Sequence, residues 1–153
     1  MSGERLSIVI PAYNEEDSVD DILRRCLEAR AVLMREAGLS GVEVVIVDDG
    51  SHDKTREKAA RWTEAKLITH EKNKGYGAAL MTGFHAASGD LLGFLDADGT
   101  CDPLAFKGLI QALRRDNADM SVGARLHSGS QMPAVRALGN RLYALLLMSL
   151  TGV

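Results

Sequence analysis

The sequence has little cysteine and no long apolar run. Only Cys26 and Cys101 occur among 153 residues, too few for a disulfide framework or a zinc cluster, so a reducing compartment such as the cytoplasm is expected. No apolar run reaches the roughly 18 residues of a membrane span. Residues 1–5 lead directly into an apolar strand pattern, so no secretory signal is expected.

Acidic residues are missing from the C-terminal part. All 21 lie at or before Asp119, and the residues that follow carry three of the 18 basic ones. A basic, apolar tail on an acidic body favours an anionic partner for the tail. Three arginines are too few for a nucleic-acid footprint, so no nucleic acid is expected as a partner.

Short apolar runs alternate with helical patterns along the chain. Five runs predict strands at Leu6–Ile10, Val42–Val47, Lys66–Thr69, Leu91–Leu95 and Met120–Val122. Helices are predicted at Glu15–Ala37, Asp53–Trp62, Gly77–Ala87, Pro103–Arg114 and Ala134–Leu150. The alternation predicts a single α/β domain, a mostly parallel, Rossmann-like sheet with helices on both faces. Ligands bind such sheets at the carboxyl ends of the strands.

Three predicted strands end in carboxylates and turn-forming residues. The segments are Pro11-Ala12-Tyr13-Asn14-Glu15, Asp48-Asp49-Gly50-Ser51 and Asp96-Ala97-Asp98-Gly99. Each acidic residue alone is a candidate helix cap. Five carboxylates crowded at one edge of a sheet repel each other, however, unless a cation or a network of donors compensates.

Asp96 and Asp98 are the candidate metal ligands. Residues two apart on an extended chain point the same way, so both carboxylates can face one point. Hard oxygen ligands of this kind suit Mg²⁺ or Mn²⁺, which also take water and diphosphate oxygens. A D-x-D sequence is common by chance, and its place after an apolar strand strengthens the prediction.

Other motifs carry no chemistry of their own. Gly75-Tyr76-Gly77 begins like a dinucleotide fingerprint, but Leu80 stands where the last glycine belongs, so a tight turn into a helix is expected. No phosphate-binding G-x-x-x-x-G-K-[ST] segment is present. The histidines lack metal-ligand spacing and are expected on the solvated surface, at positions 52, 70, 85 and 127.

The strand-end motifs resemble glycosyltransferase family 2, whose members have the GT-A fold and use nucleotide sugars. The segments SIVIPAYNEEDSV, VVIVDDGSHDKT, NKGYGAALMTGFHAASGDLLGFLDADGT and VGAR occur in the family's order. Within the family, the chain is most similar to the polyprenyl-phosphate sugar transferases of the dolichyl-phosphate mannose synthase type.

The resemblance implies a site for a nucleotide-diphospho-sugar donor, a GDP- or UDP-sugar. The segment after the first strand would hold the base and ribose, and the end of the second strand would make a further nucleotide contact. Asp96 and Asp98 would bind the Mg²⁺ or Mn²⁺ cofactor and the diphosphate. The implied donor-binding residues are Pro11, Ala12, Tyr13, Glu15, Val47, Asp48, Asp49, Asp96, Ala97 and Asp98.

The resemblance also implies an acceptor site in the basic tail. Arg125 would act in catalysis with Asp96 and Asp98 by facing the phosphate of a lipid acceptor, and the implied acceptor-phosphate residues are Arg125, Arg136, Asn140 and Arg141. Some relatives have a glutamine ligand where this chain has Thr100, which leaves the third protein ligand open.

Residues 1–123 would then be the donor-binding core, and residues 124–153 the start of an acceptor-side segment. The apolar face of its helix would either lie near the cytoplasmic side of the membrane or pack against the sheet or another subunit. Because the sequence ends within this apolar pattern, we expect it to be part of a longer protein, and an exposed apolar end would favour homo-oligomers.

Together these features predict a metal-dependent transferase that moves a sugar to a polyprenyl phosphate, and the resemblance alone implies inversion at the sugar carbon. A phosphate acceptor needs no general base, which agrees with the absence of carboxylates after Asp119. A truncation that removed the base would fit the same absence equally well. Three alternatives stay open: a nucleotide-sugar-binding fragment without catalysis, a transferase acting on a saccharide hydroxyl, and a nucleotidyltransferase. The last usually has a glycine- and lysine- or arginine-rich loop after the first strand, which Pro11–Glu15 does not provide.

Overall fold

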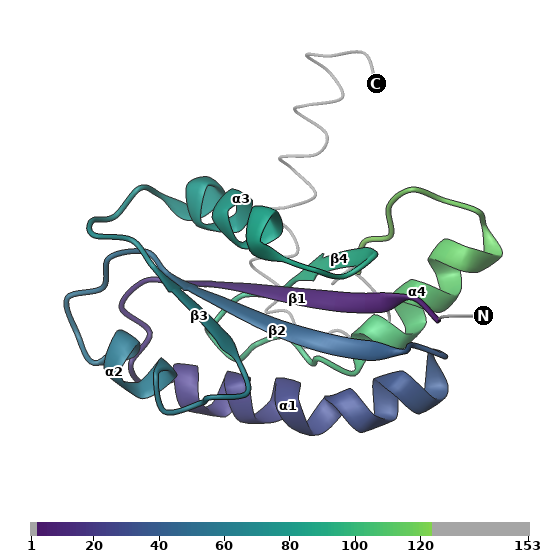
Figure 1. The fold of residues 1–153 in the computed structure, drawn as a ribbon, viewed down its shortest axis with the longest axis horizontal. Helices are drawn as coiled ribbons and strands as arrows, with labels where there is room; N and C mark the ends of the chain where they lie inside the picture. The colour runs from purple at the N-terminus through teal and green to yellow at the C-terminus, as the bar shows by residue number, and fades with distance from the viewer. Residues whose placement is uncertain (1–2, 124–153) are drawn as a thin grey trace, which may run out of the picture. The chain divides into compact units, whose positions relative to one another are not determined.

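The computed structural model describes residues 3–123, which contain a sheet of four parallel strands (Figure 1). The order across the sheet is β3-β2-β1-β4. The strands are β1 (Arg5–Ala12), β2 (Gly41–Asp48), β3 (Lys66–Thr69) and β4 (Leu91–Phe94). All four therefore end at the same edge of the sheet.

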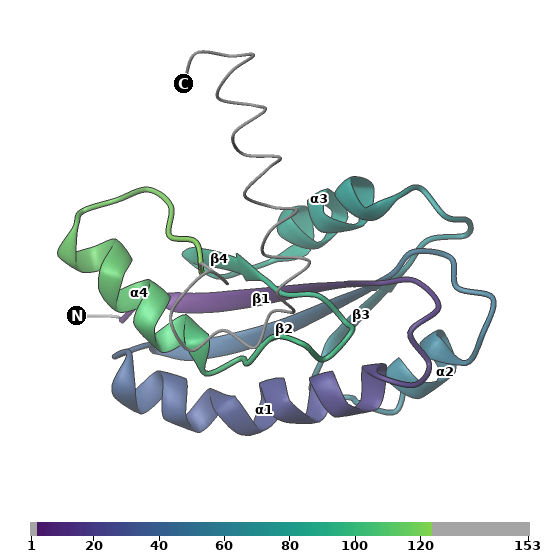
Figure 2. The ribbon, with the colours of Figure 1, turned by 180° about the vertical axis from the view of Figure 1, so that it is seen from behind.

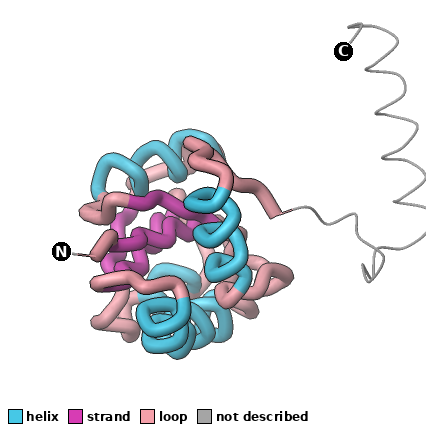
Figure 3. Tube along the Cα trace, turned by 90° about the vertical axis from the view of Figure 1, so that its right-hand side faces the viewer, coloured by secondary structure: helices cyan, strands magenta, loops and turns pink. Residues whose placement is uncertain are grey.

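Helices cover both faces of this sheet, as the α/β prediction requires (Figure 2). They are α1 (Val19–Glu36), α2 (Thr55–Ala59), α3 (Tyr76–Ala86) and α4 (Ala105–Arg115). α3 lies on one face, across β1 and β2, while α1 and α2 lie on the other. The view in Figure 3 shows the strands between these helical layers. Among the described residues, no helix is both long and apolar enough to cross a membrane.

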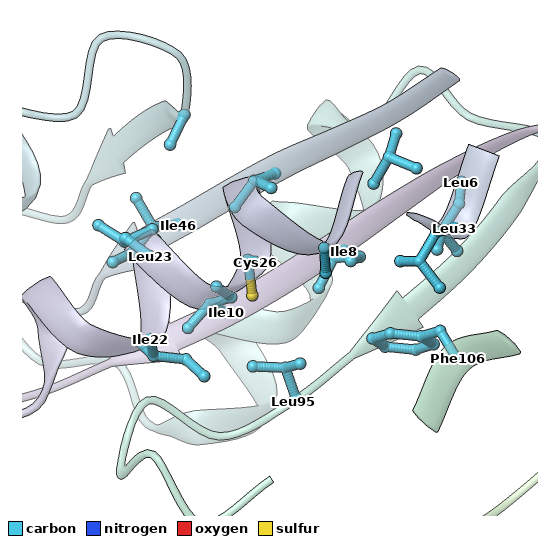
Figure 4. Close-up of a cluster of buried hydrophobic side chains, with 14 of the residues drawn as sticks. Leu6, Ile8, Ile10, Ile22, Leu23, Cys26, Leu33, Ile46, Leu95 and Phe106 are labelled. Carbon is cyan, nitrogen blue, oxygen red and sulfur yellow. The ribbon is translucent and has the colours of Figure 1, made fainter. Parts of the chain in front are cut away.

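The alternation of side chains along β1 and β2 explains the two buried faces. In β1, Ile8 and Ile10 pack with α1, whereas Val9 points to the α3 face. Successive side chains of a strand alternate between faces, and an apolar residue at nearly every position lets a strand be buried on both. Figure 4 shows the larger of the two cores, between the sheet, α1 and α4; its labelled residues are Leu6, Ile8, Ile10, Ile22, Leu23, Cys26, Leu33, Ile46, Leu95 and Phe106.

Three predicted elements differ clearly from the structure. Residues 120–122 are not a strand in the described part of the chain, because so short a segment forms a strand only where a neighbouring strand pairs with it. The helix predicted at Asp53–Trp62 is the shorter α2, Thr55–Ala59. α1 begins at Val19 rather than Glu15, since residues 16–18 form a turn in which the amides of Ser18 and Val19 both donate to the Glu15 carbonyl. The predicted helix at Ala134–Leu150 lies outside the described residues.

Close packing of α3 on the sheet yields a first prediction. A Cβ atom at Gly83 would overlap Cγ1 of Val9 and lie 3.2 Å from Cγ2 of Val47, whereas one at Gly77 would meet nothing within 4 Å. Gly83→Ala should therefore lower the free energy of unfolding by about 1–3 kcal/mol through overpacking. The matched change Gly77→Ala should raise it by up to about 1 kcal/mol, since alanine favours the helix. Urea unfolding of both variants tests this, and equal stabilities would contradict the packing of α3 against β1.

Candidate active site

A cleft of about 320 Å³ lies at the carboxyl ends of β1, β2 and β4. Among its lining residues, eight belong to the predicted donor site: Pro11, Ala12, Tyr13, Glu15, Asp49, Asp96, Ala97 and Asp98. Three were not predicted: Asn73, Tyr76 and Ala79. The structure thus brings together the ends of three strands that lie far apart in the sequence. Val47 and Asp48 are fully buried and do not line the cleft.

The loops after β1 and β2 hold each other in place. The amide of Asn14 donates to Ser51 Oγ at 3.0 Å, and the amide of His52 donates to Asn14 Oδ1 at 2.9 Å. The amide of Glu15 donates to Thr55 Oγ1 at 2.7 Å. These short polar side chains satisfy backbone donors that would otherwise lack partners where the chain leaves the sheet. The loops after β1 and β2 therefore form one wall of the cleft together.

Asp49 is held by a buried hydrogen-bond network. Its Oδ1 lies 2.6 Å from Nδ1 of His70 and accepts from the amide of Lys74, while Oδ2 accepts from the amide of Gly75. Burial would raise the pKa of Asp49, but these donors outweigh it and lower the pKa below its usual value. His70 Nε2 lies 3.0 Å from Thr82 Oγ1. The carboxylate thereby joins the end of β2 to the segment that leads into α3.

The expectation of solvated histidines is wrong for His70, which is only 5% exposed. His52 and His85 are exposed as expected, and His127 lies outside the described residues. The signal for His70 was its position directly after a strand: its amide donates to the carbonyl of Asp48, which extends the pairing of β2 with β3. Metal-ligand spacing was the wrong criterion, because its partner is a carboxylate.

Asp48 has a structural partner rather than a place in the cleft. Its Oδ2 accepts from Nε of Arg56 at 2.9 Å, and the same guanidinium donates to the carbonyl of His70 at 3.0 Å. A fully buried carboxylate needs such compensation. The role of Asp48 and Val47 in nucleotide binding stays a prediction.

Asp96 and Asp98 lie in the loop after β4, and each accepts a hydrogen bond from a hydroxyl. Tyr76 donates to Asp96 Oδ1 at 2.8 Å, and Thr100 Oγ1 donates to Asp98 Oδ1 at 2.8 Å. Burial and the bond to Asp96 raise the pKa of Tyr76 to about 12, so its phenol keeps the proton at neutral pH. Arg25 of α1 also stabilises this loop: its guanidinium donates to the carbonyls of Gly99 and Cys101 at 2.7 and 2.8 Å.

The fit of a divalent cation can be judged from these donors. Within residues 3–123, no group of three or more His, Cys, Asp or Glu side chains is arranged to hold a metal ion. Two carboxylates on an open cleft do suit Mg²⁺ or Mn²⁺, which are commonly bound by one or two carboxylates together with substrate phosphates.

The predicted acceptor residues Arg125, Arg136, Asn140 and Arg141 lie outside the described part of the chain.

Comparisons with known proteins agree with this geometry. The family model described as "Glycosyl transferase family 2" matches residues 7–142. The chain is 33% identical to a dolichol-phosphate mannosyltransferase of Pyrococcus furiosus, covering 84% of this chain and 35% of that protein. It is 34% identical to an undecaprenyl-phosphate 4-deoxy-4-formamido-L-arabinose transferase of Pseudomonas fluorescens, covering 97% and 43%. The chain thus spans less than half the length of these relatives.

Solved structures confirm the predicted GT-A type of α/β fold. One is glucosyl-3-phosphoglycerate synthase from Mycobacterium tuberculosis in complex with Mn²⁺, UDP and its product, with a TM-score of 0.56 and 29% identity over 72% of this chain and 40% of that one. A mannosyltransferase from Pyrobaculum calidifontis has a TM-score of 0.60 at 24% identity, over 72% and 32%.

The Asp49 network yields a second prediction. Replacing His70 by phenylalanine keeps a ring in the buried site but removes both side-chain hydrogen bonds and leaves the Thr82 hydroxyl without that partner. The free energy of unfolding should fall by about 1–3 kcal/mol. His85→Phe makes the same change on an exposed histidine of α3 and should shift stability by less than about 0.5 kcal/mol. Chemical denaturation measures both, and equal effects would refute the structural role of His70.

Proposed function

The chain belongs to glycosyl transferase family 2, and from that membership we propose that it takes part in moving a sugar from a nucleotide-diphospho-sugar to a polyprenyl phosphate, with inversion at the sugar carbon. The observation that carries the proposal is the cleft itself. It gathers the ends of β1, β2 and β4 with the two aspartates on its rim. Ligands of open parallel sheets bind at this edge.

The donor would lie along the cleft from β1 to β4. Tyr13 and Glu15 on one side would contact the base and ribose, and Asp96 and Asp98 on the other would face the diphosphate. The Mycobacterium tuberculosis structure holds UDP with Mn²⁺, which favours a UDP-sugar as the donor. A GDP-sugar is the other donor that the family resemblance implies. The amides and hydroxyls that fix the loops leave little reorganisation for the moment of binding, and such preorganisation strengthens binding.

Asp96 and Asp98 would hold Mg²⁺ or Mn²⁺, with the diphosphate oxygens as further ligands. Such a cation acts as a Lewis acid that stabilises the negative charge on the departing nucleoside diphosphate. The protein's part would be to keep both carboxylates aimed at the cleft. Hydrogen bonds from Thr100 and Tyr76 serve that purpose.

The acceptor is proposed from the relatives and the tail. Both curated relatives are named for transfer to a polyprenyl phosphate, dolichol phosphate in one and undecaprenyl phosphate in the other. Arginines in the tail would bind the acceptor phosphate as charge-assisted partners, and the proposed residues are Arg125, Arg136, Asn140 and Arg141. A phosphate oxygen is already deprotonated and can attack the sugar carbon without a general base.

Donor binding can be tested on this chain by its thermal stability. A ligand that binds only the folded state raises the melting temperature. We expect UDP or GDP to do so, each measured with and without Mn²⁺, and we expect the larger shift when the metal is present. CDP serves as the comparison nucleotide. If none of the diphosphates stabilises the chain, the proposed donor site is wrong.

A separate variant tests whether Asp98 is a ligand of the metal ion. Asp98→Asn should remove the Mn²⁺-dependent part of the shift, because it takes a charge from the proposed site while keeping the side chain's shape. Asp102→Asn is the matched control, since Asp102 is exposed in the same loop and lies outside the cleft lining. An undiminished Mn²⁺ effect in Asp98→Asn would rule out this residue as a ligand. In the enzyme that carries this chain, the same variant should abolish metal-dependent turnover of the donor sugar.

A further inference from the structure

Tyr76 connects two walls of the cleft, the start of α3 and the loop after β4. It is the first residue of α3, and its hydroxyl donates to Asp96 Oδ1, at the end of β4, across 2.8 Å. The ring lines the cleft and is about half exposed. The contact therefore lies at the site surface, where a bound donor would meet it.

The position of the phenol is set by the backbone before it. Gly75 has a φ of +94°, a conformation that places the start of α3 directly over the end of β2. The amides of Lys74 and Gly75 are held by the Asp49 carboxylate at 2.9 and 2.8 Å. Further along α3, Ala79 is buried against Val9 and Val47. Tyr76 therefore projects from an anchored helix start, not from a loop that could follow Asp96.

We propose that Tyr76 is a positioning residue for Asp96: its hydroxyl fixes the orientation of the carboxylate that binds the divalent cation. The inference rests on the proposed function, because it takes Asp96 to be a metal ligand. A carboxylate can accept about four hydrogen bonds or ligands through its two oxygens. The Tyr76 hydroxyl occupies one of these positions, on Oδ1, and so constrains the orientation of the group. Hydrogen bonds to metal-binding carboxylates commonly set metal affinity in this way.

Asp98 has an equivalent arrangement, which supports this interpretation. The amide and the hydroxyl of Thr100 both donate to its Oδ1, at 3.0 and 2.8 Å. Thr100 lies in the same loop as Asp98, two positions further along the chain. Asp96 takes its hydroxyl from another element, 20 positions earlier in the chain. The geometry of the two carboxylates thus depends on how α3 is placed, and not only on the loop that carries them.

The test is the affinity of the chain for Mn²⁺, measured from free Mn²⁺ by electron paramagnetic resonance. Tyr76→Phe keeps the ring and removes only the hydroxyl. Mn²⁺ should bind roughly 10-fold more weakly, the lower end of the effect seen when such outer partners are removed. The titration is run with Mn²⁺ alone and with whichever of UDP or GDP gives the larger thermal shift. The melting temperature without metal should not change, which separates the loss from a folding defect.

The matched control is Ser88→Ala, which also removes a hydroxyl that donates to a carboxylate, Glu43 Oε2 at 3.1 Å. Ser88 lies outside the cleft lining, and the Mn²⁺ affinity of this variant should equal that of the unchanged chain. In the enzyme that carries this chain, the activity lost in Tyr76→Phe should return when the Mn²⁺ concentration is raised. A general distortion of the cleft would not be corrected in that way.

Asp96→Asn distinguishes failure of this inference from failure of the proposed function. If Asp96→Asn weakens Mn²⁺ binding and Tyr76→Phe leaves it unchanged or tighter, the positioning role is wrong and the metal site stands. If neither Asp96→Asn nor Asp98→Asn affects Mn²⁺, the metal site is wrong and the inference falls with it. Weaker binding in both Asp96→Asn and Tyr76→Phe, with an unaffected Ser88→Ala, supports the proposal.

Discussion

The cleft depends on how the Asp49 carboxylate is held. It sits just past the end of β2, and its oxygens accept from His70, after β3, and from the two amides that precede α3. One buried charge thereby sets the path of the chain from β3 into α3. Gly50 completes the arrangement, because a side chain there would lie 2.5 Å from the backbone carbonyl carbon of Lys72. Without this network neither Asn73 nor Tyr76 would be placed to line the cleft.

Hydrogen-bond donors of the protein relieve the repulsion among the five carboxylates at one edge of the sheet. Each of them is compensated by a donor from the protein, so their clustering does not by itself require a cation. For Glu15, Asp48, Asp49, Asp96 and Asp98 these donors are, in turn, Ser18, Arg56, His70, Tyr76 and Thr100. The argument for a metal therefore rests on where Asp96 and Asp98 lie and on the family, not on the repulsion.

The sequence was sufficient for the sheet and most of the cleft, but not for the contacts between its walls. Apolar residues at nearly every position of β1 and β2 are a strong signal of strands buried on both faces, and the parallel order then places the strand ends together. Tyr76 and His70 could not be found in this way. Their roles depend on distances across the fold. A tyrosine after a glycine has no characteristic pattern, and the position of His70 directly after a strand does not reveal that its partner is Asp49. The predicted strand at 120–122 failed because pairing, not composition, decides short strands.

A site with two carboxylates has a consequence for how donor and metal bind. Mg²⁺ and Mn²⁺ prefer six ligands, and two aspartates leave the remainder to water and the diphosphate. Metal affinity and donor affinity are then linked, since each ligand raises the affinity for the other by the same factor. The orientation of Asp96 therefore affects more than the metal. Through this linkage, the Tyr76 hydroxyl on α3 would influence how tightly the donor is held.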